Sequence, residues 1–278
     1  MSSASNFRAT KLKLGTVQQT LLTPLYARAR EINHASPIIV DRKAAEIIET
    51  LEHDFDAIAR FNDTLTGCAI RASILDGWMK SFLQEHPEST VTLIGEGLDT
   101  TFDRNDNGKA TWFEMDLPDV ISLRRNVFEP HLRRHLLPAN LMEDGWLDQI
   151  SQAGSKSQLF QFAGVTMYLK PDVVRNLFTR IADRFPGAVI LFDTTSELGV
   201  KNSHRWECTV RTTGANYYFG IDNPRDIANW HPSLEVTNVE SMMNYRRDRW
   251  SWKVRLATFW WRRLRYSYLI NRAVVRAS

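Results

Sequence analysis

The sequence has few cysteines and no long apolar run. Among 278 residues only Cys68 and Cys208 are cysteines, too few for a disulfide framework. The first fifteen residues, MSSASNFRATKLKLG, lack the apolar core of a signal peptide, and no apolar run approaches membrane-spanning length. Hydrophobic residues make up 43% of the chain, enough for a sizeable core. We therefore expect one soluble, cytoplasmic domain over residues 1–278.

Two kinds of site are also missing from the sequence. No G-x-S-x-G elbow and no Ser-His-Asp or Cys-His arrangement can be found, which argues against a hydrolase.

Residues 103–114 match the calcium loop of an EF-hand, but such a loop needs a helix on each side, and Glu114 falls in a predicted strand. His204 and His231 have no partner at metal-ligand spacing. We interpret residues 103–114 as a solvated turn and expect no metal site.

The most informative stretch is a glycine turn between two predicted strands. Gly95, Glu96 and Gly97 follow the apolar strand 90–94, and Asp116 follows the strand 111–115. In an open α/β sheet these two strand ends flank the crevice in which a nucleoside cofactor lies. Glycine admits the ligand there, and the acid accepts protons from the ribose hydroxyls. The pattern predicts a nucleoside-type cofactor.

The turn favours one cofactor of this type over another. A dinucleotide site requires a third glycine, where this chain has Thr100. Glu96 and Asp99 would repel a pyrophosphate but tolerate the ammonium and sulfonium of S-adenosylmethionine. We therefore expect S-adenosylmethionine rather than NAD.

The alternation of strands and helices predicts an α/β fold with a parallel sheet. Strands are expected at 90–94, 111–115, 135–139, 159–163 and 188–193, and helices at 17–34, 65–84 and 171–185. We divide the chain into an N-terminal helical extension (1–85), a cofactor-binding core (86–195) and an acceptor and lid region with the C-terminal elements (196–278).

Several segments together resemble the leucine carboxyl methyltransferase and polyketide O-methyltransferase family. The glycine turn continues as Gly95 to Phe102, and Phe113 to Pro118 matches the family's [YF]-E-x-D-x-P segment. Further matching segments are 22–30, 37–41, Arg71 with Asp76, 146–148 and 164–169. The resemblance implies a class I, Rossmann-like methyltransferase with helices on both faces of the sheet. It also implies O-methylation of a small polyketide-like or carboxylate acceptor.

The resemblance implies a set of site residues. Arg71 would reach the methionine carboxylate of the cofactor, or else form a surface salt bridge with Asp76. Tyr168 and His204 are candidates for contact with the acceptor, which needs mainly to be held in line with the methyl group. The expected cofactor-binding residues are Arg71, Gly95, Glu96, Gly97, Asp99, Asp116, Leu117, Asn140, Leu141 and Ala163.

Two positions depart from the family pattern. Ala163 and Asn140 stand where relatives often carry acids. These departures favour the main alternative, a methyltransferase-fold binding protein without catalysis. A nicotinamide oxidoreductase is a further alternative, which Thr100 disfavours.

The C-terminal segment is basic and aromatic. Residues 246–278 hold ten Arg or Lys and a single acid, Asp248. An apolar stripe at helical spacing favours one helix packed on the core, with basic side chains at its edges. The stripe consists of Trp250, Val254, Ala257, Trp261, Leu264 and Tyr268. Contact with an anionic surface is the alternative, and we do not expect a nucleic-acid partner.

Overall fold

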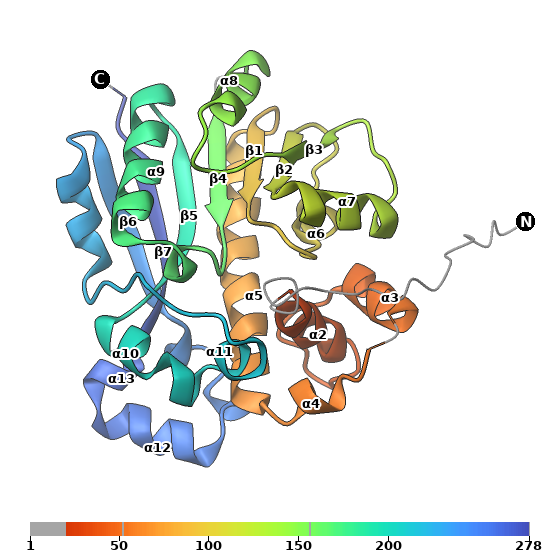
Figure 1. Cartoon of the computed structure of the whole chain (residues 1–278), viewed down its shortest axis with the longest axis vertical. Helices are drawn as coiled ribbons and strands as arrows, with labels where there is room; N and C mark the ends of the chain where they lie inside the picture. Colours follow the sequence, from red (N-terminus) through yellow and green to blue (C-terminus); the bar gives the residue numbers. More distant parts are fainter. Residues whose placement is uncertain (1–20, 52, 156, 278) are drawn as a thin grey trace, which may run out of the picture.

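One seven-stranded sheet forms the centre of the computed structural model, which describes residues 21–51, 53–155 and 157–277 (Figure 1). The strand order is β3-β2-β1-β4-β5-β7-β6. The strands are β1 (Thr90–Ile94), β2 (Thr111–Asp116), β3 (Arg134–Pro138), β4 (Gln158–Phe162), β5 (Val189–Thr195), β6 (Leu234–Ser241) and β7 (Tyr268–Val275). Strands β1 to β5 pair in parallel, whereas β7 runs antiparallel to both β5 and β6. The expected α/β class and all five expected strands are confirmed.

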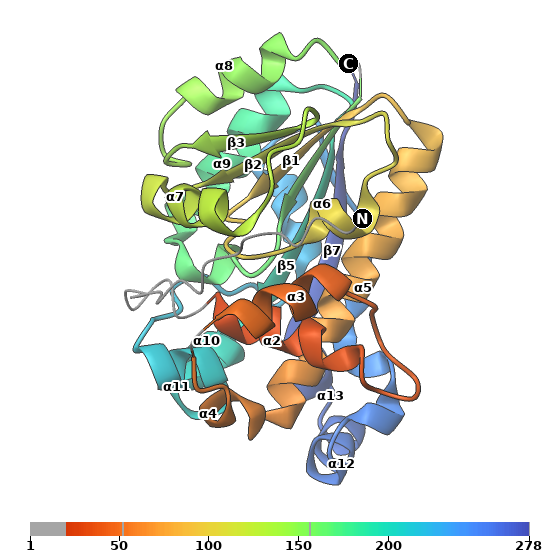
Figure 2. The same cartoon turned by 90° about the vertical axis from the view of Figure 1, so that its right-hand side faces the viewer.

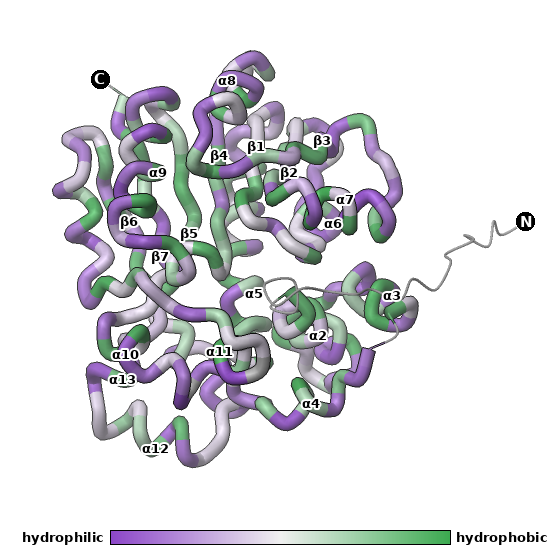
Figure 3. Tube along the Cα trace, in the orientation of Figure 1, coloured by the Kyte–Doolittle hydropathy of each residue, from purple (hydrophilic) through white to green (hydrophobic). Residues whose placement is uncertain are grey.

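Helices cover both faces of this sheet. On one face α5 (Asn62–Glu85) buries Ile70, Ile74 and Met79 against the strands. On the other face lie α8 (Gly145–Gln152) and α9 (Pro171–Arg184), the latter through Val174, Leu177 and Phe178. Figure 2 shows the sheet from its edge, with α5 and α9 on opposite sides. Because helices cover both faces, every residue of β4 and β5 is buried, and β5 begins with the apolar run Val189 to Phe192 (Figure 3).

The remaining core helices are short. They are α6 (Thr101–Asn105) after the glycine turn and α7 (Pro118–Val127) after β2. Proline at the first turn of α7 suits a helix start, where its missing N–H is not needed.

The N-terminal extension packs beside the carboxyl edge of the sheet. It consists of α2 (Leu22–Glu31), α3 (Arg42–Thr50) and α4 (Asp56–Ala59). Their apolar faces form a separate core with Leu65 of α5, Leu98 of the glycine turn and Leu123 of α7. The expected helix 17–34 corresponds to α2, with residues 17–20 outside the described residues.

The C-terminal region returns to the sheet. It contains α10 (Glu197–Trp206), α11 (Cys208–Thr213), η2 (Pro224–Trp230), η3 (Met242–Asn244), η4 (Arg247–Arg249), α12 (Trp252–Trp260) and α13 (Arg262–Arg265), interleaved with β6 and ending in β7. Within the part of the chain that the structure describes, none of these or the other helices combines the length and apolarity needed to span a membrane.

The single packed helix expected at the C-terminus is wrong. Trp250 is buried at 5% exposure, but Trp261 is 67% exposed. The chain breaks at Trp261 between α12 and α13, and Tyr268 already belongs to β7. The i, i+4 spacing of the apolar residues therefore did not mark one continuous helical face, because the segment changes direction twice.

Candidate functional site

The glycine turn lies at the switch point of the sheet. Strand order reverses between β1 and β4, so the turns after these two strands diverge and leave a crevice. Gly95 and Gly97 adopt left-handed backbone conformations with φ of 67° and 55°. A Cβ on Gly95 would lie 2.6 Å from Cγ2 of Val165, so a larger residue fits only if Val165 moves.

Asp116 ties the second strand end to the glycine turn. Its Oδ2 accepts a hydrogen bond from Gly97 N at 2.8 Å, and its Oδ1 accepts one from Leu117 N at 2.7 Å. Burial raises the pKa of Asp116, and these two N–H donors partly offset the increase. The Asp116 carbonyl accepts from Ala139 N, which places Asn140 and Leu141 at the neighbouring strand end.

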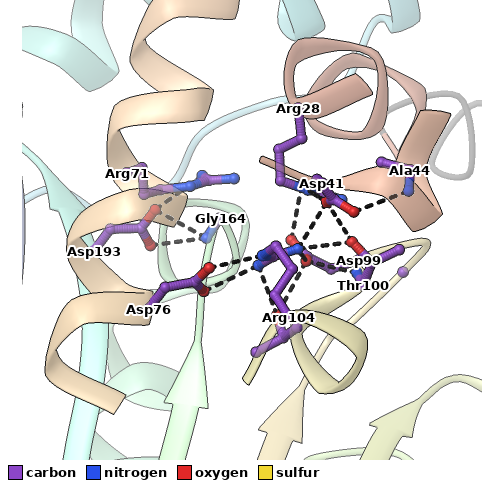
Figure 4. A network of polar contacts seen from close by, with 12 residues as sticks. Arg28, Asp41, Ala44, Arg71, Asp76, Asp99, Thr100, Arg104, Gly164 and Asp193 are labelled. Carbon is purple, nitrogen blue, oxygen red and sulfur yellow. Dashed lines mark hydrogen bonds and ion pairs between the residues drawn. The ribbon is translucent and has the colours of Figure 1, made fainter. Parts of the chain in front are cut away.

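Arg71 is held at the crevice by Asp193, a residue that the sequence did not single out. Its Nη1 donates to Asp193 Oδ2 at 3.0 Å and to the Tyr268 hydroxyl at 3.1 Å. Asp193 is fully buried and also accepts from Gly164 N (Figure 4). The alternative pairing of Arg71 with Asp76 is wrong, because Arg104 occupies both oxygens of Asp76. Among the described residues, Arg71 Nη2 has no hydrogen-bond partner.

Two arginines and three aspartates join the N-terminal extension to the glycine turn (Figure 4). Arg104 contacts Asp76 of α5, Asp41 before α3 and Asp99 of the turn. Arg28 of α2 contacts Asp41 and Asp99 at 2.9 and 2.8 Å. Although burial opposes ionisation, these two guanidinium groups hold the pKa of Asp99 well below its usual range. Asp99 is therefore a fixed negative charge at the edge of the site.

Glu96 is the unpaired acid of the turn. It is 7% exposed, and its Oε1 is buried without a hydrogen-bond partner in the described part of the chain. Burial, followed by the charge of Asp99, raises its pKa well above the ordinary value. A cation placed beside Glu96 would relieve both effects.

A cavity of about 510 Å³ runs from the glycine turn to the C-terminal helices. Of the residues expected from the sequence, it is lined by Arg71, Gly95, Glu96, Asp99, Ala163 and Tyr168. Its wall at the C-terminal helices is largely apolar and includes Met242, Met243, Trp250, Val254, Trp261 and Leu264. The other five expected residues lie outside this lining: Asp116 ends β2, and Gly97, Leu117, Asn140 and Leu141 lie after the ends of β1, β2 and β3.

Glu207 is a cavity residue that sequence reasoning missed. It separates α10 from α11 and has an extended backbone (φ −91°, ψ 120°). Its carboxylate makes no hydrogen bond or ion pair within the described residues, and burial raises its pKa to about 7. No motif marks it; the only sequence signal is an acid at the break between two short helices. His204, one helical turn earlier, instead lies exposed on α10 and does not line the cavity.

Two tyrosines accompany Glu207. The rings of Tyr168 and Tyr217 meet edge to face with centroids 5.1 Å apart, and both line the cavity. Burial raises the pKa of Tyr168 to about 12, so this hydroxyl stays protonated at neutral pH. It can donate a hydrogen bond but is a poor base.

The residues 103–114 follow a course that differs from an EF-hand. Asp103 and Asn105 lie in α6, and Glu114 lies in β2, where it pairs with the buried Arg124. Within the described residues, no cluster of three or more His, Cys, Asp or Glu side chains is arranged to hold a metal ion.

Comparisons with known proteins agree with this geometry. A model of the leucine carboxyl methyltransferase family matches residues 21–182. The chain is 28% identical over 234 residues to the tetracenomycin polyketide synthesis O-methyltransferase TcmP of Streptomyces glaucescens, covering 84% of this chain and 86% of that protein. It is 26% identical over 255 residues to the S-adenosyl-L-methionine-dependent methyltransferase dpfgK of Gibberella zeae, covering 84% and 85%.

A solved structure supports the fold. A crystal structure of a candidate methyltransferase from Thermobifida fusca superposes with a TM-score of 0.57 at 14% identity, over 90% of this chain and 94% of that one. The family match spans more than half of the chain, from α2 through the switch-point crevice to α9. The protein therefore belongs to the leucine carboxyl methyltransferase family and is an S-adenosylmethionine-dependent methyltransferase.

Proposed function

We propose that the protein methylates a hydroxyl oxygen of a small, largely apolar, polyketide-like acceptor. The observation that carries this proposal is Glu207, a carboxylate with no hydrogen-bond or ion-pair partner among the described residues, in a cavity that the glycine turn also lines. The relative TcmP, a tetracenomycin polyketide synthesis O-methyltransferase, supports the same class of acceptor.

The residues at the crevice fit S-adenosylmethionine. Glu96 Oε1 and Arg71 Nη2 have no hydrogen-bond partner in the described part of the chain; the first suits an ammonium group and the second a carboxylate. Asp116 keeps further lone pairs on each oxygen for ribose hydroxyls beyond its two backbone bonds. When bound, S-adenosylmethionine supplies a methyl group that its sulfonium already activates.

The far side of the cavity fits an apolar acceptor with a polar edge. Met242, Met243 and Trp250 offer a polarisable, adaptable wall, as methionine-rich surfaces do. Glu207 faces the same space and accepts the proton that the acceptor hydroxyl loses. Tyr168, which remains protonated, orients the acceptor by a hydrogen bond.

Glu207 also favours a hydroxyl acceptor over a carboxylate. A carboxylate acceptor needs no base, and its charge would be repelled by an ionised Glu207 in a partly desolvated cavity. A phenol gains from a base whose pKa lies close to neutral pH. The acid in the cavity therefore selects an acceptor that has a proton to lose.

The test is a methyl-transfer assay with radiolabelled S-adenosylmethionine and matched acceptors. A set of polycyclic aromatic compounds that differ only in carrying a hydroxyl, a carboxyl or an amino group is incubated with the full-length protein. We expect labelled methyl ether from the hydroxyl member and much less product from the other two. Preferred methylation of the carboxyl member would contradict the hydroxyl assignment.

Calorimetry combined with the methyl-transfer assay separates this proposal from the alternative of an inactive binding protein. S-adenosylmethionine and its demethylated product should both bind, and NAD should not. Cofactor binding without turnover of any oxygen acceptor would support the binding protein, to which Ala163 and Asn140 point.

A further inference from the structure

The segment of residues 252–265, which we term the basic aromatic segment, presents large apolar side chains to solvent. It comprises α12, Trp261 and α13 at one end of the molecule (Figure 1). The exposed apolar residues, with their exposed fractions, are Trp252 (69%), Leu256 (51%), Phe259 (61%), Trp260 (71%) and Trp261 (67%). Arg265 Nε donates to Thr258 O at 2.9 Å and holds the two helices together. Such a gathering of exposed aromatic and aliphatic residues typically marks an interaction surface.

The same segment carries unneutralised positive charge. Lys253, Arg255, Arg262 and Arg263 are exposed and form no ion pair with the residues that the structure describes. The sequence from 252 to 265 contains no Asp or Glu. A partner must therefore offer apolar surface and negative charge together.

Charge argues against two occupants that the chain itself could provide. A second copy docked through the same face would bring like charges together, at a cost. The first twenty residues contain Arg8, Lys11 and Lys13 but no acid, so they too would add like charge. The complementary partner is anionic.

The pattern of side chains favours a lipid surface among anionic partners. Trp and Phe side chains with a protruding Leu insert at the level of the headgroups, while Lys and Arg contact anionic lipids. Nucleic acids stack on aromatic rings but gain little from an exposed aliphatic side chain such as Leu256.

We propose that the basic aromatic segment docks the protein on an anionic phospholipid bilayer. Trp261 and Leu264 of this segment also line the cavity, so docking places one wall of the cavity at the lipid surface. An apolar acceptor dissolved in the bilayer then reaches the cavity without crossing bulk water. The docking itself does not depend on which oxygen is methylated.

Vesicle sedimentation of the full-length protein tests this proposal. Vesicles of phosphatidylcholine alone are compared with vesicles that also contain phosphatidylserine. We expect the wild type to sediment with the anionic vesicles and to remain mostly in solution with the neutral ones. The double variants Arg262→Glu with Arg263→Glu, and Phe259→Ala with Trp260→Ala, should each weaken binding about tenfold or more.

Matched controls separate docking from general charge or hydrophobicity. Arg125→Glu with Arg175→Glu makes the same charge change at exposed positions on α7 and α9. Leu132→Ala with Met142→Ala removes exposed apolar side chains elsewhere. Both controls should bind like the wild type, and circular dichroism checks that each variant is folded.

Four results would overturn the proposal. The wild type could fail to sediment with anionic vesicles, or the surface variants could bind as well as the controls. Alternatively, the protein could prefer duplex DNA or RNA over vesicles, or form a dimer that Phe259→Ala with Trp260→Ala abolishes in analytical ultracentrifugation.

Discussion

Arg71 of α5 and Asp193 of β5 are 122 residues apart in the chain, yet Arg71 Nη1 lies 3.0 Å from Asp193 Oδ2. The pair anchors the guanidinium at the crevice and leaves its second terminal nitrogen for a ligand. Because the Asp193 carboxylate also accepts from Gly164 N, the pair fixes the turn after β4 as well.

Arg71→Lys should keep the fold and weaken the binding of S-adenosylmethionine about tenfold or more. Lysine preserves the charge beside Asp193 but cannot contact two partners with a planar fork. Calorimetry measures the affinity, and thermal unfolding measures the stability. A folded variant with unchanged affinity would mean that Arg71 serves only the structure.

Asp116→Asn should reduce cofactor affinity by an order of magnitude or more. Charge-assisted hydrogen bonds to ribose hydroxyls contribute about 1.5 to 3 kcal/mol each, and the amide retains only one acceptor oxygen. Asp172→Asn, at an exposed position in the first turn of α9, is the matched control. Equal affinities of both variants would place the ribose elsewhere.

Methyl transfer should increase with pH around a midpoint of about 7, the pKa of Glu207. Its carboxylate accepts a proton only above that pH, so activity rises as the group ionises. Glu207→Gln should lower the rate and remove this step from the pH profile. An unchanged pH profile in Glu207→Gln would show that another group accepts the proton of the acceptor hydroxyl.

The same pKa predicts the direction of a stability change. Burial raises the Glu207 pKa from 4.5 to about 7, so the folded state binds the proton more tightly than the unfolded state. Proton binding by Glu207 therefore stabilises the folded state fully below pH 4.5, and this stabilisation is lost as the pH rises through about 7. Denaturant unfolding of the wild type and Glu207→Gln should diverge over that interval.

Arg104→Ala should destabilise the protein by about 3 to 5 kcal/mol, because it leaves Asp41, Asp76 and Asp99 without a shared buried cation. Lys43→Ala, which removes a cation from the exposed i, i+3 pair with Glu46, should change stability far less. Chemical denaturation of both variants measures the difference. Equal losses of stability in the two variants would show that the ion pairs of Arg104 do not stabilise the fold.

Trp250→Ala should cost about 3 to 5 kcal/mol of stability, as loss of a core aromatic does. Trp250 is 5% exposed, and its Nε1 donates to Tyr245 O at 3.0 Å. Trp261→Ala, at 67% exposure, should cost about 1 kcal/mol or less. A loss of stability for Trp261→Ala as large as that for Trp250→Ala in thermal unfolding would mean that Trp261 packs on the core, as the sequence suggested.

The sequence by itself determined the cofactor half of the protein. Each of its five strands contains a short group of apolar residues, and the turn after the first strand contains two glycines that the observed left-handed conformations require. Both signals are local, because burial on two faces and backbone conformation act on neighbouring residues. The family resemblance rests on the same local motifs.

Tertiary structure alone decided which distant side chains pair with one another and which residues line the cavity. Asp193 reaches Arg71 only because α5 packs on the face of the sheet. The segment β7 becomes a strand by inserting between β5 and β6. Glu207 and Trp250 face the cavity, whereas His204 and Trp260 do not. Such assignments depend on where distant segments meet. Helical spacing within residues 246–278 could not reveal that the chain turns at Trp261 and leaves Phe259, Trp260 and Trp261 exposed to solvent.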